Sequence, residues 1–396
     1  MQNPTTRRSF LGCSAGWLGA AVLAHALGER GGAATNKEPR DFTIVEGHCD
    51  IWEFNARFAV NDKSQWSPLR DFIAPRLIEA GVSVVIMPCG GDSIDERGRR
   101  DALTGGSLRV LDMLLTEVEK TKGKVSIIRT KADVPQQPNR GKVQLFLDME
   151  GGASISDPEP EPAYDYDPER QMAVLHQFFR LGMRGLQLTH NGRNGLGQGV
   201  ADSQMGTQLS EFGVAVVKEM NCLGMMVGVS HLCQAAVLQV AELSTKPIVS
   251  THQNLYPYLK SNLELRPEEV KAIAKTGGIV GMRYISEETT PYSLLADEME
   301  HIASTVGVEH TGISWLGHDV GNPAPDYVPG FTKPPRTFTG VEAETMLQHW
   351  QNFIKALSDR GFNDDQIGLI LGGNYARIWN QILPDTDPAP TIGCNV

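Results

Sequence analysis

The chain alternates short apolar runs with longer segments of helical period, and this alternation constrains its fold more than any other feature. Most of the apolar runs are continuous, as in strands that are buried on both faces of a parallel sheet. Segments in which apolar residues recur with the 3.6-residue period of a helix separate these runs. Eight runs have this character, at residues 42–50, 82–89, 143–151, 185–190, 225–231, 247–252, 277–284 and 311–319.

Eight strand–helix units in one chain predict a (β/α)8 TIM barrel, with a doubly wound open sheet as the alternative. We expect the barrel to occupy residues 40–384, followed by a tail at 385–396, and we treat the weaker apolar run at 124–130 as a satellite strand. Two proline-rich stretches, 157–169 and 321–340, follow strand ends and are expected to lie over the mouth of the barrel.

Local signals mark the ends of several predicted helices. Glycine directly follows the helical pattern at Gly182, Gly224, Gly277 and Gly307, a position at which helices commonly end. Asn374, in the sequence GGNYARIW, is expected to cap the last helix.

The charge of the chain limits its partners. The sequence has 396 residues, a formal net charge of −11 and a pI near 5.4. A net charge of this sign repels nucleic acid and anionic lipid from the average surface. We therefore expect a small-molecule substrate and no nucleic-acid partner, and the composition leaves a homodimer open.

The first 26 residues differ in kind from the rest of the chain. Arg7 and Arg8 precede the sequence SFLG and an uncharged run that is shorter and richer in Gly and Ala than a typical membrane span. The pattern resembles a twin-arginine export signal with a small-residue cleavage site at Ala24 and Ala26. It predicts a periplasmic or secreted protein without a stable membrane anchor.

The cysteines do not predict a disulfide framework. Five cysteines remain when Cys13 is set aside with the signal, and none of them forms a C-x-x-C pair. An odd number of cysteines at irregular spacing does not indicate which of them would pair.

Polar side chains that bind metals recur at the ends of the predicted strands. Four of the ten histidines lie there, and in a barrel the carboxyl ends of all strands meet on one face. Residues far apart in the sequence would thus form one site. The strand-end residues are His48, Asp50, Glu150, His190, His231, His252 and Asp319.

Imidazoles and carboxylates suit zinc, and a carboxylate has two oxygens with which it can bridge two cations. His48, Asp50 and Glu150 could hold one ion, and Glu150, His231 and His252 the other. Two such ions would acidify a shared water toward hydroxide at neutral pH, which predicts a hydrolase.

Each of these residues has a structural alternative when taken alone, because a single strand-end histidine more often bonds to a neighbour than to a metal. Their joint placement on successive strand ends favours the metal site. The remaining histidines of the predicted barrel are interpreted as structural or solvated: His176, His301, His310, His318 and His349.

Several short motifs occur together in an order and spacing that resemble the membrane (renal) dipeptidase family of zinc metallopeptidases. The resemblance runs from about residue 44 to 382 and includes the sequences EGHCD, MEGG, LQLTHN, GVSH, PIVSTH, GGIVG, GHD and GGNYARIW. It implies a (β/α)8 barrel of the metal-dependent hydrolase type with two zinc ions. It also implies a ligand set of His48, Asp50, Glu150, His231 and His252.

The resemblance further implies that His190 binds or polarises the substrate carbonyl and that Asp319 handles protons. The chain departs from the family where an arginine grips the C-terminal carboxylate of a dipeptide, because it has Leu263 at that position. Lys260 or Arg266 are candidate replacements. The family sequence GGDFDG is here GHDVGN, which keeps only the first aspartate.

The sequence therefore predicts an exported binuclear-zinc hydrolase that cleaves the amide bond of a dipeptide or a similar N-acyl amino acid. A related amidohydrolase that opens a lactone or cyclic amide is the alternative, since the carboxylate-binding arginine is absent. A binding or scaffold protein on a decayed barrel is a third interpretation, but it would predict lost ligands.

Overall fold

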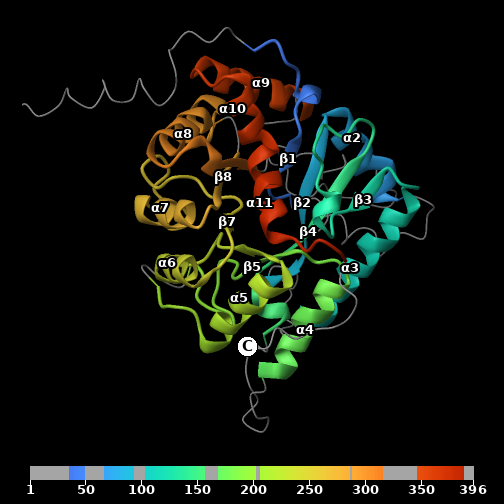
Figure 1. The fold of residues 1–396 in the computed structure, drawn as a ribbon, viewed down its shortest axis with the longest axis vertical. Helices are drawn as coiled ribbons and strands as arrows, with labels where there is room; N and C mark the ends of the chain where they lie inside the picture. Colours follow the sequence, from blue (N-terminus) through green and yellow to red (C-terminus); the bar gives the residue numbers. More distant parts are fainter. Residues whose placement is uncertain are drawn as a thin grey trace, which may run out of the picture.

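Eight parallel strands form a nearly closed ring in the computed structural model, which describes residues 35–49, 67–92, 103–156, 168–201, 206–285, 288–314 and 346–387 (Figure 1). Neighbours in the ring follow the order of the chain. The strands are β1 (Ile44–Glu46), β2 (Val82–Gly91), β4 (Val143–Glu150), β5 (Gly185–Gln187), β6 (Met226–Gly228), β7 (Ile248–Ser250), β8 (Ile279–Arg283) and β9 (Thr311–Ser314).

A hydrogen bond links the first and last strands of the ring. The backbone N–H of Gly47, just after β1, donates to the carbonyl of Ile313 in β9 at 3.2 Å. The predicted barrel is thus confirmed, and the open doubly wound sheet is not observed. The satellite strand is also confirmed, because β3 (Val125–Ile127) pairs with β4 outside the ring.

Helices surround the ring and follow the strands in the alternation that the sequence predicts (Figure 1). They are α2 (Ala74–Glu79), α3 (Leu103–Lys120), α4 (Pro168–Arg180), α5 (Glu211–Leu223), α6 (Gln234–Leu243), α7 (Pro267–Lys275), α8 (Tyr292–Thr305), α9 (Met346–Asp359), α10 (Asp364–Gly368) and α11 (Asn374–Ile382). The expected glycine ends are present: Gly224 has a left-handed backbone (φ 77°) directly after α5. Of the described helices, none is long and apolar enough to cross a membrane.

The strands are continuously apolar because both of their faces are buried. Alternate residues of one strand belong to different cores: Val85 packs outward with the helices, whereas Val84 packs inside the barrel. The inner core also contains Tyr375 and Trp379 from α11, and the Trp379 ring stacks on Phe146 of β4 with centroids 4.7 Å apart. Helix α11 therefore fills the barrel interior from one end.

The side chain of Asn374 does not cap α11, and that expectation is wrong. Its Nδ2 donates to the carbonyls of Val308 and Thr311, both at 2.8 Å, while the preceding Gly373 occupies the cap position. The last helix is thus tied to the start of β9 by a buried amide.

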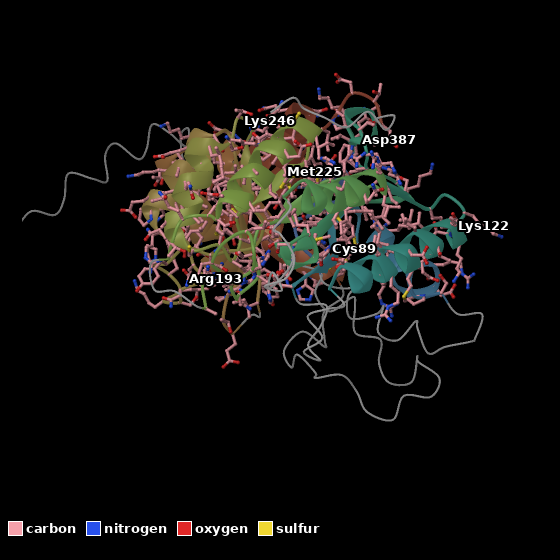
Figure 2. The ribbon with its side chains drawn as sticks, turned by 90° about the horizontal axis from the view of Figure 1, so that it is seen from below. Cys89, Lys122, Arg193, Met225, Lys246 and Asp387 are labelled. Atoms are coloured by element: carbon pink, nitrogen blue, oxygen red, sulfur yellow. The ribbon has the colours of Figure 1, made fainter. Side chains whose placement is uncertain are left out.

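The C-terminal segment crosses the amino ends of the strands and is held by charged side chains. The buried guanidinium of Arg184 bonds to Asp387 at 2.8 Å, and Lys131 bonds to Asp385 at the same distance. Figure 2 places Asp387 and Lys246 at one side of the molecule and Arg193, which follows β5, at the other.

One disulfide is present that the cysteine spacing did not reveal. Cys222, in α5, is disulfide-bonded, and its partner lies outside the described residues. Cys49, Cys89 and Cys233 are buried thiols. Pairing between distant parts of a chain depends on the fold, so spacing alone could not identify it.

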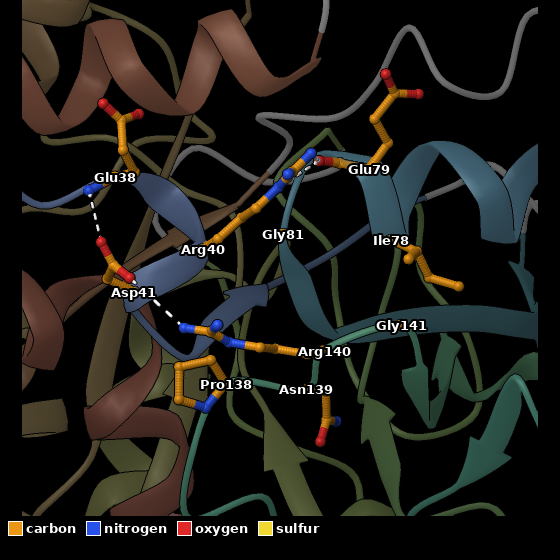
Figure 3. A pocket seen from close by; sticks show the side chains of 10 residues that line it. All are labelled: Glu38, Arg40, Asp41, Ile78, Glu79, Gly81, Pro138, Asn139, Arg140 and Gly141. Atoms are coloured by element: carbon orange, nitrogen blue, oxygen red, sulfur yellow. Dashed lines mark hydrogen bonds and ion pairs between the residues drawn. The ribbon is translucent and has the colours of Figure 1, made fainter.

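A cavity of about 570 Å³ lies at the amino end of the barrel, between the segments that precede β1, β2 and β4 (Figure 3). Its two arginines have partners within the chain. Arg40 donates to the carbonyl of Glu79 at 2.8 Å, and Arg140 lies 3.8 Å from Asp41. This cavity is on the face opposite the predicted site.

Candidate metal centre

Five of the predicted site residues lie together at the carboxyl end of the barrel. Glu150 is the last residue of β4, and the four histidines follow the ends of β1, β5, β6 and β7 by two or three residues. The Nε2 atoms of three histidines lie near one carboxylate oxygen, Oε1 of Glu150: His48 at 3.4 Å, His231 at 3.3 Å and His252 at 3.4 Å. Nε2 of His190 lies 3.9 Å from the other oxygen.

The potential ligand atoms form two groups that share Glu150. One contains His48 and His252, the other His190 and His231, and within each group the ligand atoms lie within 4.8 Å of one another. The sequence predicts the shared carboxylate but groups His252 with His231. The two predicted carboxylates Asp50 and Asp319 lie outside the described residues, as does His318.

Backbone geometry brings His231 into the cluster. It has a φ of 63°, in the left-handed region that a non-glycine residue rarely adopts. Such a conformation costs on the order of 1–2 kcal/mol, so the surrounding structure must maintain it. The carbonyl of His231 accepts a hydrogen bond from Val200 N–H at 2.9 Å, which helps to hold this turn.

The electrostatics of the cluster favour a charged Glu150 carboxylate beside a neutral His252 imidazole. Burial disfavours the charge on Glu150, but His48 and hydrogen bonds from the three imidazoles outweigh it and hold the pKa of this carboxyl well below its usual value. Burial, together with His48 and His231, holds the pKa of His252 well below that of a free imidazole, although Glu150 opposes this. These are the protonation states in which both groups bind cations.

The donor atoms of the cluster suit a cation. Nε2 of His231 and Nε2 of His252 are 2.7 Å apart, the distance of a hydrogen bond, so one of these two atoms carries a hydrogen when no ion is bound. Nδ1 of His231 lies 2.9 Å from Oδ1 of Asn191, an acceptor, so its hydrogen is on Nδ1 and its Nε2 lone pair is available. The donor set of imidazole and carboxylate is the one that zinc prefers.

Residues 36–387 match the sequence profile of the membrane dipeptidase family, also called peptidase family M19. The chain belongs to this family. Among curated proteins it is 24% identical over 281 residues to a dipeptidase named verJ from Clonostachys rogersoniana. That match covers 70% of this chain but only 65% of the relative's length.

Solved structures of two metallopeptidases share the fold. A metallopeptidase of family M19 called dipeptidase AC superposes with a TM-score of 0.68 at 19% identity, covering 86% of this chain and 99% of that one. A metallopeptidase from Rhodobacter sphaeroides, liganded with a phosphinate mimic of the dipeptide L-Ala-D-Ala, superposes with a TM-score of 0.67 at the same identity and coverages.

One positioning residue of this family member was missed by sequence reasoning. Asp92 directly follows β2, the one early strand to which no site residue was assigned. Its carboxylate accepts from the backbone N–H of Ala153 at 2.7 Å, the N–H of His190 at 3.2 Å and the side-chain amide of Asn194 at 3.0 Å. Burial raises the pKa of Asp92, and these hydrogen bonds lower it only in part.

The two cations predicted to contact substrate are engaged elsewhere. Nζ of Lys260 and the guanidinium of Arg266 each lie 4.7 Å from the centre of the Tyr256 ring. The backbone carbonyl of the half-buried Leu263 accepts a hydrogen bond from Gln253. The two cationic side chains of the loop after β7 therefore lie over an aromatic ring of the same loop.

Four histidines outside the cluster have structural hydrogen bonds. His176 bonds to Glu219 at 2.8 Å, His301 to Tyr258 at 3.3 Å and His310 to the carbonyl of Gly278 at 2.7 Å. His349 is buried against the hydroxyl of Tyr292. These contacts agree with the structural role predicted for them.

Proposed function

We propose that this protein is an exported hydrolase with two zinc ions that cleaves the amide bond of dipeptides. One observation carries the proposal: a single carboxylate oxygen of Glu150 lies 3.3–3.4 Å from Nε2 of three histidines contributed by three other strands. Membership of the membrane dipeptidase family and the names of the relatives support amide cleavage over the opening of a lactone or cyclic amide.

His48, Glu150, His231 and His252, with Asp50 as predicted, would hold the ions. Bound zinc supplies Lewis acidity and activates water at neutral pH. The residues that would hold the ions are shielded from water: the side chains of His48 and His252 are fully buried and that of Glu150 is 6% exposed. A water-poor site of this kind strengthens every electrostatic interaction within it.

His190 is placed to contact the substrate. Its side chain is 28% exposed, far more than the other members of the cluster, so an incoming molecule reaches it first. From this position its imidazole can orient and polarise the carbonyl of the scissile bond. Asp319 remains the predicted residue for proton transfer to the leaving amine.

The proposed substrate follows from the residues of the loop after β7. Leu263 cannot form the paired, charge-assisted hydrogen bonds by which an arginine binds a carboxylate, an interaction of about 1.5–3 kcal/mol. That energy corresponds to about ten- to a hundredfold in binding. We therefore propose weak saturation by ordinary L,L-dipeptides and better turnover of substrates whose carboxylate is blocked or bound by another cation.

A panel of substrates tests this function on the zinc-loaded protein. It comprises L,L- and L,D-dipeptides, the same dipeptides with the C-terminal carboxylate blocked as an amide, N-acyl amino acids and lactones. The L,D series is included because the related Rhodobacter sphaeroides structure holds a mimic of L-Ala-D-Ala. We expect dipeptide hydrolysis, and the Leu263→Arg variant should raise kcat/KM about tenfold for free dipeptides only.

Two results would contradict the proposal. A protein with both ions bound that hydrolyses lactones but no peptide would refute the substrate class. A wild type that already requires a free carboxylate, with no change in the Lys260→Ala and Arg266→Ala variants, would refute the argument from Leu263. Lys333 and Arg336, outside the described residues, would then be the next candidates for the clamp.

A further inference from the structure

Glu298, a fully buried acid in the middle of α8, bonds to the loop between β7 and α7. Its Oε1 accepts from the backbone N–H of Leu255 and its Oε2 from the side-chain nitrogen of Asn254, both at 2.7 Å. Asn254 is fully buried as well. A buried carboxylate is costly unless its oxygens have hydrogen-bond donors, and here both donors come from one loop.

Helix α8 contacts the same loop at a second point. Nδ1 of His301, one turn after Glu298, lies 3.3 Å from the hydroxyl of Tyr258. The two rings meet edge to face with their centroids 5.8 Å apart. One face of α8 therefore holds the first half of the loop.

The first half of the loop is paired with the second half, which carries Leu263. The carbonyl of Asn254 accepts from the N–H of Leu265 at 2.9 Å, and the N–H of Tyr256 donates to the carbonyl of Leu265 at the same distance. The N–H of Asn254 also donates to Oε2 of Glu264 at 2.7 Å. Leu263 directly precedes these two partners of Asn254, so its position depends on that of Asn254.

His252, at the start of the loop, has a separate support. The N–H of the next residue, Gln253, donates to the carbonyl of Gly281 in β8 at 3.0 Å. This bond holds the chain beside His252 whether or not Glu298 is present. Loss of the Glu298 bonds should therefore displace the segment around Leu263 and leave His252 in place.

We propose that Glu298 is a positioning residue for substrate binding, which acts on Leu263 through the loop between β7 and α7. The inference rests on the proposed function in one respect, that Leu263 faces the substrate. The hydrogen bonds that the structure describes for Glu298 go to Asn254 and Leu255, and none goes to a member of the cluster around Glu150. Its effect on the reaction is thus indirect and should fall on binding.

The contact with Asn254 does not depend on the charge of Glu298. Burial raises the pKa of Glu298 to about 7, although the bonds from Leu255 and Asn254 lower it. Oδ1 of Asn254 is buried, and no described residue bonds to it, so this amide is able to turn and accept a hydrogen from a neutral Glu298. A glutamine at this position could donate the same hydrogen and still accept from Leu255.

Three variants separate the hydrogen bonds from the bulk and charge of the acid. Glu298→Leu removes both acceptors at similar side-chain volume, whereas Glu298→Gln keeps both contacts. Asn254→Ala removes one of the two bonds and is the milder change. Asp297→Asn is the matched control, because Asp297 is the preceding residue of α8 and its carboxylate bonds to Arg360, outside the loop.

The readouts are steady-state kinetics with a dipeptide, zinc content, and hydrogen exchange of the Leu255 amide in the metal-free protein. Glu298→Leu should raise KM about tenfold and keep kcat within about twofold, because it changes binding and not the reacting groups. Zinc content should stay at the wild-type value, and the Leu255 amide should exchange about tenfold faster or more. Asn254→Ala should raise KM by less, and Glu298→Gln and Asp297→Asn should match the wild type.

A wild-type KM in Glu298→Leu would overturn the inference. A fall in zinc content and kcat together with the rise in KM would also overturn it, since that pattern indicates a general loss of structure. If Glu298→Leu fails to fold, an unchanged KM in Asn254→Ala overturns the inference instead. A wild type that hydrolyses no dipeptide would refute the proposed function, whereas unchanged exchange of the Leu255 amide in Glu298→Leu would refute the positioning.

Discussion

The carboxylate of Asp92 ties the ends of three strands together. It follows β2, accepts from Ala153 after β4 and accepts from the backbone of His190 after β5. Gly151 allows this approach, because a Cβ there would lie 2.2 Å from the Asp92 carboxyl carbon. The backbone position of His190 thus depends on Asp92. The hydrogen bonds that the structure describes for Asp92 go to Ala153, His190 and Asn194, and not to the predicted ligands Glu150 and His231.

Asp92→Asn should lower kcat/KM for a dipeptide by about ten- to a hundredfold, because one acceptor oxygen becomes an NH2 group that faces N–H donors and His190 shifts. Zinc content should stay at the wild-type value, since no ligand is changed. Steady-state kinetics with metal analysis checks this, and Asp359→Asn, at an exposed ion pair on α9, is the control. Loss of zinc in parallel with activity would show that Asp92 supports the metal site rather than His190.

The members of the His/Glu cluster could be predicted from the sequence, whereas the residues that support them could not. His48, His231 and His252 follow recognisable apolar runs, and the barrel places such positions on one face. Asn191 acts through a side-chain bond made by a loop, and no periodic pattern encodes the path of a loop. Asp92 had the right signal, a carboxylate after a strand, but no family motif drew attention to it.

The contact between β1 and β9 closes the barrel, and Gly47 makes it possible. A Cβ at this position would lie 2.3 Å from the Tyr375 hydroxyl and 2.5 Å from the Ile313 carbonyl, far inside van der Waals contact. Gly47, which directly precedes His48, therefore lies against both the Ile313 carbonyl that closes the barrel and the tyrosine of α11.

Gly47→Ala should lower the free energy of unfolding by at least about 1–3 kcal/mol, because the added methyl group displaces the strand or the tyrosine. Gly105→Ala is the control: it lies in α3 with no atom within 4 Å of the added Cβ, and it should stabilise the protein by about 0.5–1 kcal/mol. Denaturant unfolding measures both. Equal stability of Gly47→Ala and wild type would contradict the closure described here.

Helix α7 begins with a buried acid whose protonation is linked to stability. Glu269 accepts from the N–H of Arg266 at 2.9 Å, and burial raises its pKa to about 7 from an ordinary value of 4.5. The folded state thus holds the proton more tightly than the unfolded state does. The stability from this group is complete below about pH 4.5 and is lost as the pH rises through about 7.

Glu269→Gln should remove this dependence, since glutamine keeps an acceptor for Arg266 without a charge. The variant should match the wild type near pH 4.5 and exceed it at about pH 8 by up to about 3 kcal/mol in free energy of unfolding. Denaturant melts across this range provide the test. A difference between the two proteins that does not vary with pH would contradict the raised pKa.

The order of strands and helices was predictable because buried parallel strands are continuously apolar. The position of α11 could not be predicted, because the alternation of strand and helix does not indicate that a terminal helix enters the barrel interior. Tyr375 and Trp379 do so because their rings fill the space between Phe146 and its neighbours. The expectation that Asn374 is a cap failed because Asn374 is the first residue of the helix and Gly373 occupies the cap position, while the Asn374 amide nitrogen donates to Val308 and Thr311.

Export by the twin-arginine pathway is a prediction that rests on Arg7 and Arg8. Replacing Arg7 and Arg8 together by lysine should retain the protein in the cytoplasm with its signal uncleaved, because the export system reads the arginine pair and not positive charge alone. Fractionation with an N-terminal sequence of the product checks this. Normal export of the lysine variant would exclude a twin-arginine signal.

Metal analysis of the purified protein tests the binuclear site most directly. Glu150 is the one residue shared by both groups of potential ligands, so it should serve both ions. We predict close to two zinc ions per chain in the wild type under zinc-replete conditions and loss of both from a folded Glu150→Ala variant. One ion or fewer in the wild type, or a Glu150→Ala variant that retains an ion with unchanged affinity, would contradict the account.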